Sequence, residues 1–214
     1  MDPRARRRDE DVRRLYALEA QYRGIFDVLE VDGRPPRRVR LRLAIPTARS
    51  AVFPLDRQAV SELVVELPEA YPLQEPRLTI TTPVLNPNVY ASGVVCHGMT
   101  WMPTEGLDLL VVRVMRLLAL DPAIVNLRSA ANGLAAAWYR VVIAQHPGAF
   151  PSVAIQAPRR AARPAVAWGV VPDAAVAAKR LVECTGCDAK LRVDAFKSGT
   201  VACPRCGARV EVIA

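Results

Sequence analysis

Apolar positions recur along the first part of the chain at spacings that predict one helix followed by strands. Residues 9–23 place most of their apolar side chains on one helical face and charged side chains on the other. Four later segments alternate or run apolar as strands do, at residues 25–31, 39–45, 61–67 and 78–82. Because no helical pattern separates these segments, we expect an antiparallel meander and an α+β fold.

The middle of the chain changes from periodic to irregular and back. Residues 83–103 hold no long periodic segment, and the Asn-Pro and Ser-Gly pairs within them are typical of turns. We expect an exposed loop region there, and an ordered loop of that length is usually functional. Helical spacing resumes at residues 107–120 and 127–143, and prolines end this part of the chain.

A change of composition after residue 150 indicates a domain boundary. Residues 151–180 are rich in Ala, Pro and Arg, which is typical of a linker, and one short helix is expected at 174–181. We therefore predict a larger domain over residues 1–150, a linker over 151–180 and a small domain over 181–214.

Composition excludes several classes of protein. Of the 214 residues 51% are hydrophobic, so the chain has enough apolar material to exclude a disordered or collagen-like protein. Its net charge of +8 results from 29 basic and 21 acidic residues. Three of the basic residues are lysines and the rest are arginines, a bias typical of a GC-rich genome. The opening residues are charged, and the most apolar stretch is interrupted by Arg113 and Arg116. We therefore expect neither a signal peptide nor a membrane span, and no membrane as a partner.

The cysteines divide into a cluster and a single residue. Cys184, Cys187, Cys203 and Cys206 form two Cys-x-x-Cys pairs with 15 residues between them, and four thiolates satisfy tetrahedral zinc. The small domain predicted at residues 181–214 is too short to fold on a hydrophobic core alone. We therefore predict a structural Zn²⁺ in a zinc ribbon. Crowding of the cysteines at one end is unlike a secreted disulfide scaffold and favours reduced thiols and a cytoplasmic location.

The ribbon itself leaves its role open. Short strands are expected at residues 190–193, 200–202 and 209–213, and glycines 186 and 207 suit the two tight turns that hold the metal. A redox role is not expected, because a thioredoxin-like βαβ setting is absent from the sequence. Basic residues in the ribbon allow nucleic-acid binding, but aromatic residues do not alternate with them, so an ordinary surface or a protein-docking module is favoured.

The fifth cysteine, Cys96, lies alone in the irregular region. A buried free cysteine behaves as a small apolar residue, and the two valines before Cys96 fit that role. The surrounding motifs, however, resemble those of ubiquitin-conjugating enzymes. The family passage P-x-x-Y-P-x-x-x-P is found here as PEAYPLQEP, residues 68–76. The sequence NPNV at 86–89 stands where the family has H-P-N-I, and Cys96 follows Asn88 by eight residues in GVVC.

The resemblance covers about residues 9–150 and implies a fold, an activity and partners. The family fold has an N-terminal helix, a four-stranded antiparallel meander, an active-site loop and C-terminal helices. By resemblance, Cys96 accepts a ubiquitin-like protein as a thioester from an activating enzyme and passes it to an amine of a target protein. A thiolate suits both steps, because it attacks well and is a good leaving group when an amine arrives.

The resemblance also gives roles to neighbouring residues. Asn88 is expected to donate its side-chain amide to the oxyanion of the tetrahedral intermediate, or to order the loop, or both. Asp121 lies near the expected exit loop, where an acidic group positions or deprotonates an incoming lysine; the same Asp-Pro pair is also typical of a helix end. His97 adjoins Cys96, but adjacent side chains of extended backbone point to opposite faces, so His97 is not expected to be the direct base.

Three features depart from the common family pattern. Asn86 replaces the usual histidine, although an asparagine also makes side-chain hydrogen bonds within a turn. Trp101 lies closer to Cys96 than is usual. The appended ribbon and the arginine-rich composition resemble bacterial relatives in ubiquitin-like conjugation operons, including those of anti-phage defence. The alternative function is a catalytically silent adaptor of the same fold, or a zinc-ribbon protein that binds nucleic acid.

Overall fold

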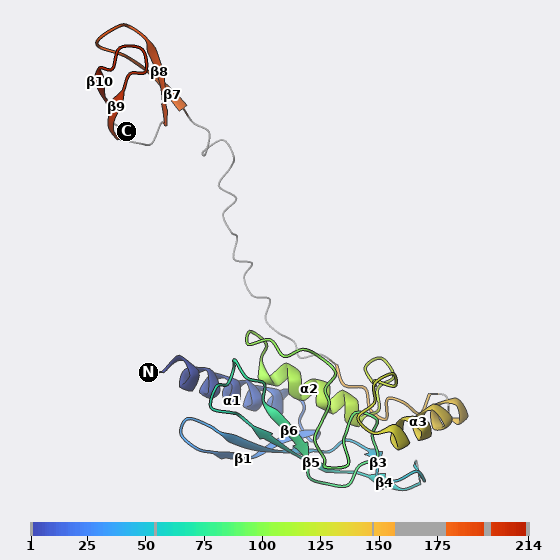
Figure 1. Ribbon diagram of the computed structural model, residues 1–214. Coiled ribbons are helices and arrows are strands. Elements are labelled where there is room, and N and C mark those ends of the chain that lie inside the picture. The colour runs from blue at the N-terminus through green and yellow to red at the C-terminus, as the bar shows by residue number, and fades with distance from the viewer. Residues whose placement is uncertain (1, 54, 147, 157–178, 195–197, 213–214) are drawn as a thin grey trace. The chain divides into compact units, whose positions relative to one another are not determined.

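A computed structural model describes residues 2–53, 55–146, 148–156, 179–194 and 198–212 (Figure 1). The chain divides into two compact units, residues 1–159 and 160–214, and each unit has its own hydrophobic cluster. The predicted linker at 151–180 lies largely outside the described residues.

The first unit begins with α1 (Pro3–Gln21), six residues before the predicted helix start. Asp2 explains the early start, because its side chain accepts a hydrogen bond from the backbone N–H of Arg4 at 3.1 Å. Pro3 follows at the first helical position, where a backbone N–H is not needed. The buried Leu15 and Leu18 lie on the face that the spacing predicted.

Four strands form one antiparallel sheet in the order β1-β2-β5-β6, which confirms the predicted meander and the α+β fold. These strands are β1 (Phe26–Asp32), β2 (Arg38–Leu43), β5 (Ser61–Glu66) and β6 (Arg77–Ile80). A short hairpin of β3 (Thr47–Ala48) and β4 (Arg57–Gln58) was not predicted, since two-residue strands are too short to show an alternating pattern.

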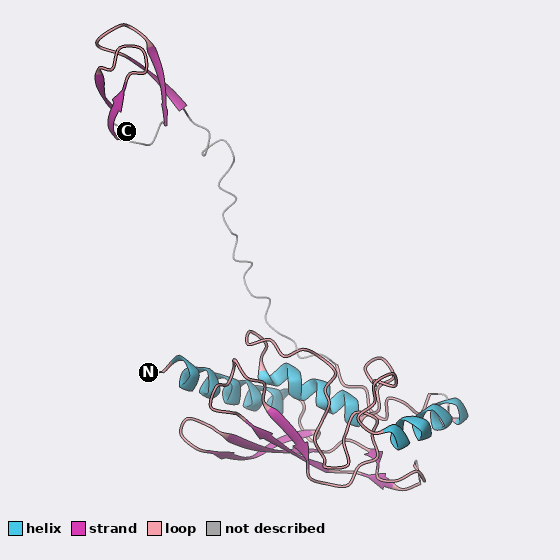
Figure 2. Ribbon diagram, viewed as in Figure 1, coloured by secondary structure: helices cyan, strands magenta, loops and turns pink. Residues whose placement is uncertain are grey.

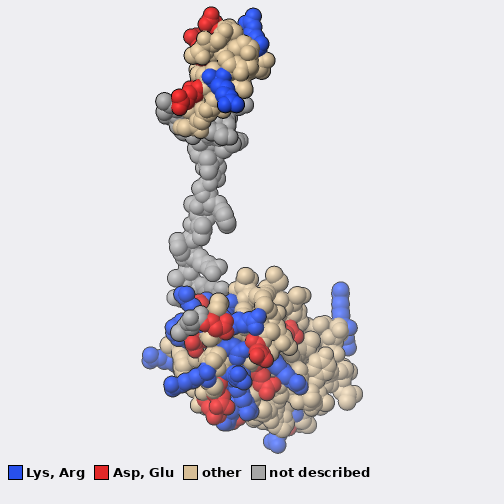
Figure 3. Space-filling view, turned by 60° about the vertical axis from the view of Figure 1, so that its left-hand side comes forward, with Lys and Arg blue, Asp and Glu red and all other residues tan. Residues whose placement is uncertain are grey.

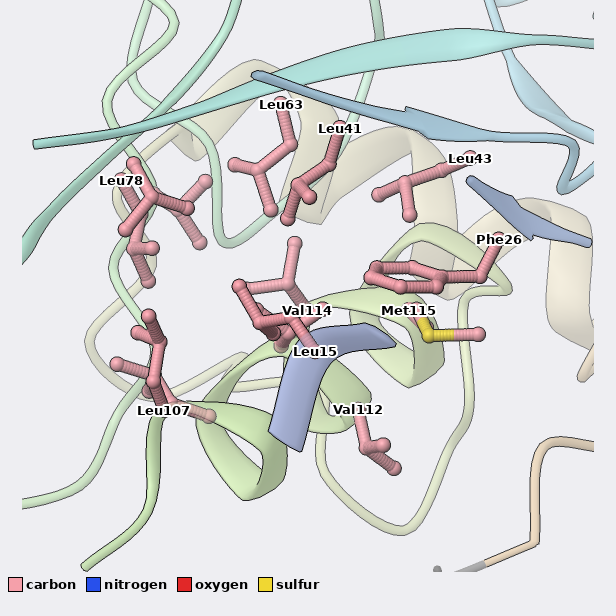
Figure 4. Packing of buried hydrophobic residues seen from close by; sticks show 14 of the residues in the cluster. Leu15, Phe26, Leu41, Leu43, Leu63, Leu78, Leu107, Val112, Val114 and Met115 are labelled. Atoms are coloured by element: carbon pink, nitrogen blue, oxygen red, sulfur yellow. The ribbon is translucent and has the colours of Figure 1, made fainter. Parts of the chain in front are cut away.

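The main core lies between the sheet and two helices. The helices α1 and α2 (Leu107–Leu118) lie on the same side of the sheet (Figure 2). In Figure 4, Leu41 and Leu63 point from the sheet toward Val114 of α2, and all three are at most 1% exposed. Because α2 is buried on nearly every side, its position is tightly fixed, and residues attached to it are fixed as well.

A second, smaller cluster surrounds α3 (Gly133–Gln145). Phe150 stacks on Phe53 and packs against Tyr139, with ring centroids 5.4 Å apart in both pairs. The prediction of helix at residues 127–132 was wrong. Asn132 caps the helix instead, because its side chain accepts the backbone N–H of Ala135 at 3.0 Å.

The second unit contains two antiparallel pairs of strands. One joins β7 (Lys179–Glu183) to β8 (Lys190–Asp194), and the other joins β9 (Gly199–Ala202) to β10 (Arg209–Val212). The strands predicted from residues 190, 200 and 209 are confirmed. The predicted helix at 174–181 was wrong for residues 179–181, which belong to β7, and residues 174–178 lie outside the described part of the chain.

Two properties of the surface bear on function. None of the helices in the described part of the chain combines the length and hydropathy needed to cross a membrane. Figure 3 shows charged side chains of both signs crowded on one part of the first unit's visible face, beside a broad area with few charged side chains. Across the sheet, Arg40 pairs with Glu30 at 2.9 Å and Glu62 at 3.4 Å, and these carboxylates raise the pKa of Arg40.

Candidate functional site

The segment that carries Cys96 is attached to the edge strand of the sheet. The backbone N–H of Val95 donates to the carbonyl of Leu78 at 2.9 Å, and that of Ile80 donates to the carbonyl of Gly93 at 2.8 Å. Gly93 has a φ of +85°, and a Cβ there would lie 2.3 Å from the carbonyl oxygen of Ile80. A glycine is therefore required for the segment to approach β6 so closely.

Asn88 makes two hydrogen bonds to the backbone of Cys96, one through its own backbone and one through its side chain. The N–H of Cys96 donates to the carbonyl of Asn88 at 2.7 Å, and Nδ2 of Asn88 donates to the carbonyl of Cys96 at 2.9 Å. The Oδ1 of Asn88 accepts the backbone N–H of Asn126 at 2.9 Å, so the same amide also fixes the crossover between α2 and α3. Asn88 is 1% exposed, and Cys96 is partly exposed with a free thiol.

Asn86 anchors this arrangement to α2. Its Nδ2 donates to the carbonyl of Leu117 at 2.7 Å, and its Oδ1 accepts the backbone N–H of Asn88 at 2.9 Å. Asn86 is fully buried, so both bonds replace water that cannot reach these groups. The side-chain amide of Asn86 thus uses both a donor and an acceptor to hold the loop.

The turn after Cys96 is held by two further contacts. Nε of Arg113, on α2, donates to the carbonyl of His97, and burial together with the nearby Arg116 lowers the pKa of Arg113. Nε1 of Trp101 donates to the carbonyl of Pro72 at 2.7 Å. Sequence reasoning did not assign Arg113 a place in the site; its signal was a charged residue in the middle of a helix whose other charged residues, Asp108 and Arg116, lie in its first and last turns.

A buried ionic cluster joins the same loops to α1. Asp11 is fully buried and accepts from Nε of Arg7 at 2.6 Å, from the hydroxyl of Tyr71 and from the backbone N–H of Leu107 at 3.4 Å. Burial and the Asp11 charge raise the pKa of Tyr71 far above its ordinary value. The Tyr71 ring packs against Trp101 with centroids 5.9 Å apart, so α1, the start of α2 and the Cys96 loop share one anchor.

Cys96 borders a hollow of about 530 Å³. His97 also borders it, because residues 96–98 form no strand and the expected alternation of adjacent side chains does not apply. His97 is 8% exposed; its Nδ1 faces the backbone N–H of Met99 at 3.4 Å, and its Nε2 lies 3.6 Å from Oε2 of Glu75. The hollow thus brings a nucleophile and a His–Glu pair to one place.

Asp121 begins the crossover after α2. Nε and Nη2 of Arg116 contact its Oδ2 at 2.8 and 2.7 Å, and its Oδ1 accepts the backbone N–H of Ala123 at 3.0 Å. Both carboxylate oxygens therefore have partners, one in the last turn of α2 and one in the crossover. Asp121 is absent from the residues that border the hollow beside Cys96, as far as the described residues show.

The four C-terminal cysteines come together as the sequence predicted. Their sulfur atoms all lie within 4.8 Å of one another, with Cys184 and Cys206 at 3.6 Å and Cys187 and Cys203 at 3.7 Å. Four sulfurs placed about 2.3 Å from one tetrahedral cation would be separated by about 3.8 Å. The donor set therefore fits a zinc ion.

The two cysteine turns repeat one backbone pattern. Cys184 and Cys203 each donate their N–H to a carbonyl five residues later, that of Ala189 at 2.9 Å and that of Ala208 at 2.8 Å. The residues four positions after these cysteines, Asp188 and Gly207, both have a positive φ. Gly186 is needed for space, because a Cβ there would lie 2.9 Å from the Cβ of Ala208.

The thiols influence one another electrostatically. The backbone N–H groups of Arg205 and Cys206 lower the pKa of Cys203 to about 6. The N–H of Ala189 acts in the same direction on Cys187, but the neighbouring thiols outweigh it and raise the pKa of Cys187 to about 12. Four sulfurs this close cannot all carry a negative charge unless a cation lies between them.

Comparison with known proteins finds a family match within the first unit. Residues 53–144 match the model of the family described as ubiquitin-conjugating enzyme. This segment contains Asn86, Asn88 and Cys96. The match begins after β3 and ends within α3, so it covers the Cys96 loop, α2 and the crossover.

Two curated relatives come from African swine fever virus, and both are described as ubiquitin-conjugating enzyme E2. The protein of strain Badajoz 1971 Vero-adapted is 36% identical over 87 residues, covering 36% of this chain and 39% of the viral protein. The protein of isolate Pig/Kenya/KEN-50/1950 is 32% identical over 87 residues, covering 36% of this chain and 38% of that protein. The chain thus spans about two fifths of the length of these relatives.

Among solved structures, human ubiquitin-conjugating enzyme E2 G1 is similar at 23% sequence identity with a TM-score of 0.43. The alignment covers 54% of this chain and 96% of the human chain.

Proposed function

We propose that the chain is a thioester carrier of the ubiquitin-conjugating kind, and the match of residues 53–144 to the model of that family supports the proposal. Cys96 accepts a ubiquitin-like protein from an activating enzyme and passes it to an amine of a target protein. The observation that carries the proposal is the pair of hydrogen bonds between Asn88 and Cys96, which holds a partly exposed thiol in a rigid loop beside a hollow.

The proposed loading step exchanges one thioester for another. The Cys96 thiolate attacks the carbonyl carbon of the modifier's C-terminal glycine, a new C–S bond forms, and the bond to the activating enzyme's sulfur breaks. Negative charge develops on the carbonyl oxygen during the attack. We propose that Asn88 donates to this oxyanion through Nδ2, which carries two hydrogens and uses one for the carbonyl of Cys96.

For Asp121 we propose a role at the acceptor side of the site. Its carboxylate holds Arg116 and the backbone of Ala123, so any effect on an incoming lysine acts through the shape of the crossover or through shared hydrogen bonds. Replacing Asp121 should therefore affect only the transfer to amines, which distinguishes its role from that of Asn88.

For the second unit we propose a structural Zn²⁺ held by Cys184, Cys187, Cys203 and Cys206. All four positions around the ion would be protein sulfurs, so the metal would supply folding energy and no open position for chemistry. The protein's own residues supply the matched backbone turns that present these sulfurs.

We further propose a bacterial ubiquitin-like conjugation system, including anti-phage defence, as the setting, and a reducing compartment such as the cytoplasm. Support comes from the arginine-rich, lysine-poor composition and from the free thiols. Loss of phage resistance on replacing Cys96 in the source organism would support this setting, and unchanged resistance in a strain with a working defence system would contradict it.

The experiment for the carrier function is loading in a reconstituted mixture. The chain is incubated with ATP and two probe pairs, ubiquitin with its activating enzyme and the ubiquitin-like pair encoded beside its gene. We expect an adduct on the wild type that a thiol reagent removes, and no such adduct on Cys96→Ser. Cys206→Ser is the matched control, because it removes a thiol from the second unit and should load normally. Loading of Cys96→Ser with a thiol-labile adduct would contradict the proposal.

A further inference from the structure

We infer that the hollow beside Cys96 is the entrance for the acceptor amine, with the Glu75 carboxylate as the group that receives its positive charge. The inference rests on the proposed carrier function and assigns to its acceptor amine, in the protonated form, the side chain that positions it beside Cys96.

The first argument is that Glu75 and Cys96 border the same hollow. The hollow of about 530 Å³ lies between the loop that ends in Glu75 and Pro76 and the segment that contains Cys96. A lysine side chain is a slender apolar stem with a charged end, and this volume accommodates it with room to spare. A thioester on Cys96 would therefore be reached from a space with a carboxylate on its wall.

The second argument is that His97 orients Glu75. Nδ1 of His97 faces a backbone N–H donor, that of Met99, so the proton of a neutral imidazole belongs on Nε2, which lies 3.6 Å from Oε2 of Glu75. His97 is itself fixed, because Arg113 donates to its carbonyl. Its lone pair is thus directed at Met99, which leaves Glu75 as the group of this pair that can accept a proton or a positive charge from the hollow.

The third argument is that the Glu75 carboxylate has fewer partners than that of Asp121 and is therefore more available to bind an amine. The two oxygens of Asp121 are engaged by Arg116 and by the backbone of Ala123. Glu75 has a side chain 60% exposed, and His97 is the one partner that the structure gives it among the described residues. Arg77 also borders the hollow, but strand register places it opposite Glu66 of β5, so an acidic residue lies next to that cation as well.

The transfer step then balances as follows. The ammonium group held by Glu75 loses one proton to water, and the free amine forms a C–N bond with the thioester carbon. The C–S bond breaks and Cys96 leaves as a thiolate. One of the remaining protons on the attacking nitrogen neutralises this thiolate, so the products are an amide and the Cys96 thiol.

The test separates charged from uncharged nucleophiles. The full chain is loaded with ubiquitin that carries a C-terminal mercaptoethanesulfonate thioester, and release of ubiquitin is followed with lysine or with hydroxylamine, which is uncharged at neutral pH. Glu75→Gln should slow release by lysine about two- to fivefold, as expected for a solvent-exposed ion pair, and leave release by hydroxylamine unchanged. Glu69→Gln is the matched control, because Glu69 is an exposed acid of the same loop that does not border the hollow.

Each outcome has a distinct meaning. Normal loading of Glu75→Gln shows that the variant is folded, and equal lysine rates for this variant and the wild type would then overturn the inference while leaving the carrier function intact. A defect in loading alone would also overturn it, because the hollow would then serve the incoming modifier. Failure of the wild type to load would overturn the carrier function on which the inference rests. Glu75→Asp, which keeps the charge, should restore part of the lysine rate.

Discussion

Asn86 shows how much of the Cys96 loop depends on one buried amide. Its two hydrogen bonds tie Asn88 to α2, and neither partner has access to water. We predict that Asn86→Ala lowers the free energy of unfolding by about 1–3 kcal/mol, because it leaves the buried N–H of Asn88 without a partner and removes one of the donors to the carbonyl of Leu117, which also accepts the N–H of Leu120 at 3.0 Å. Urea unfolding measures the effect.

The control for this prediction is Gln145→Ala, since Gln145 is an exposed amide at the end of α3 and its loss should change stability by less than about 0.5 kcal/mol. If Asn86→Ala were as stable as this control, the loop would not be anchored through Asn86.

Tyr139 makes the stability of the first unit depend on pH in the alkaline range. Burial and the nearby Asp121 raise the pKa of Tyr139 from 10 to about 12, and its hydroxyl donates to the carbonyl of Leu120 at 2.9 Å. The unfolded chain releases this proton at lower pH than the folded chain, so the stabilisation is complete below pH 10 and is lost as the pH rises toward 12.

We therefore predict that Tyr139→Phe reduces the fall in unfolding free energy between about pH 8 and about pH 11.5, measured by urea unfolding of the full chain. At the lower pH the variant should be less stable by about 1 kcal/mol, because the hydrogen bond is lost. Parallel pH profiles for the two proteins would contradict the assignment.

For single residues, the sequence predicts which residues belong to the candidate site better than it predicts which of them contact one another. Cys96 and Asn88 were recognised from their spacing, and the structure brings them together through two hydrogen bonds. The approach of His97 to Glu75 was missed, because it depends on the irregular backbone at 96–98, and the expectation for His97 assumed an extended strand.

Among the elements, α1 is linked to the Cys96 loop and to α2 by the buried cluster around Asp11. This carboxylate contacts Arg7, the hydroxyl of Tyr71 and the backbone N–H of Leu107 at the start of α2. We predict that Asp11→Asn destabilises the first unit by about 3–5 kcal/mol, because it leaves Arg7 partly buried beside a neutral group. Thermal unfolding followed by circular dichroism measures it.

Asp9→Asn is the comparison for Asp11→Asn, since Asp9 lies on the same helix and is more exposed. An equal effect of both substitutions would mean that the buried cluster does not hold the helix in place.

The elements that the sequence predicted well are those with a periodic buried face. The four strands of the sheet and α2 lie within two residues of their predicted bounds. The starts of α1 and α3 were displaced, because each depends on one capping residue, Asp2 or Asn132, rather than on the apolar pattern. The first three residues of β7 were predicted as the end of a helix, because alanines precede them in the sequence.

For the whole molecule, the separate hydrophobic clusters imply separate stabilities. The second unit has a small core of residues such as Leu191, Val193 and Val210 around the four cysteines, and the first unit shares none of these residues. We predict that a strong chelator removes one Zn²⁺ per chain and increases hydrogen exchange in β7 to β10. Exchange in the β1-β2-β5-β6 sheet should not change.

Cys203→Ser should reproduce the effect of the chelator without added reagent, and both should leave loading of Cys96 unchanged. Protection of β8 and β10 that survives loss of the metal, measured by mass spectrometry of exchanged peptides, would contradict a zinc-dependent fold. The spacing of the cysteines predicted this cluster fully, because two short turns leave little freedom in where the sulfurs lie. The domain bounds near residues 150 and 180 stay a prediction.

The central claim is that Cys96 carries a ubiquitin-like protein as a thioester, and the most direct measurement is the intact mass of the chain after reaction. Wild-type protein is incubated with ATP, an activating enzyme and its modifier, and digested peptides locate the adduct. The account predicts a mass gain equal to the modifier minus one water, located on Cys96 and reversed by a thiol. An adduct on another residue, or no adduct when the activating enzyme has formed its own thioester with the same modifier, would contradict it.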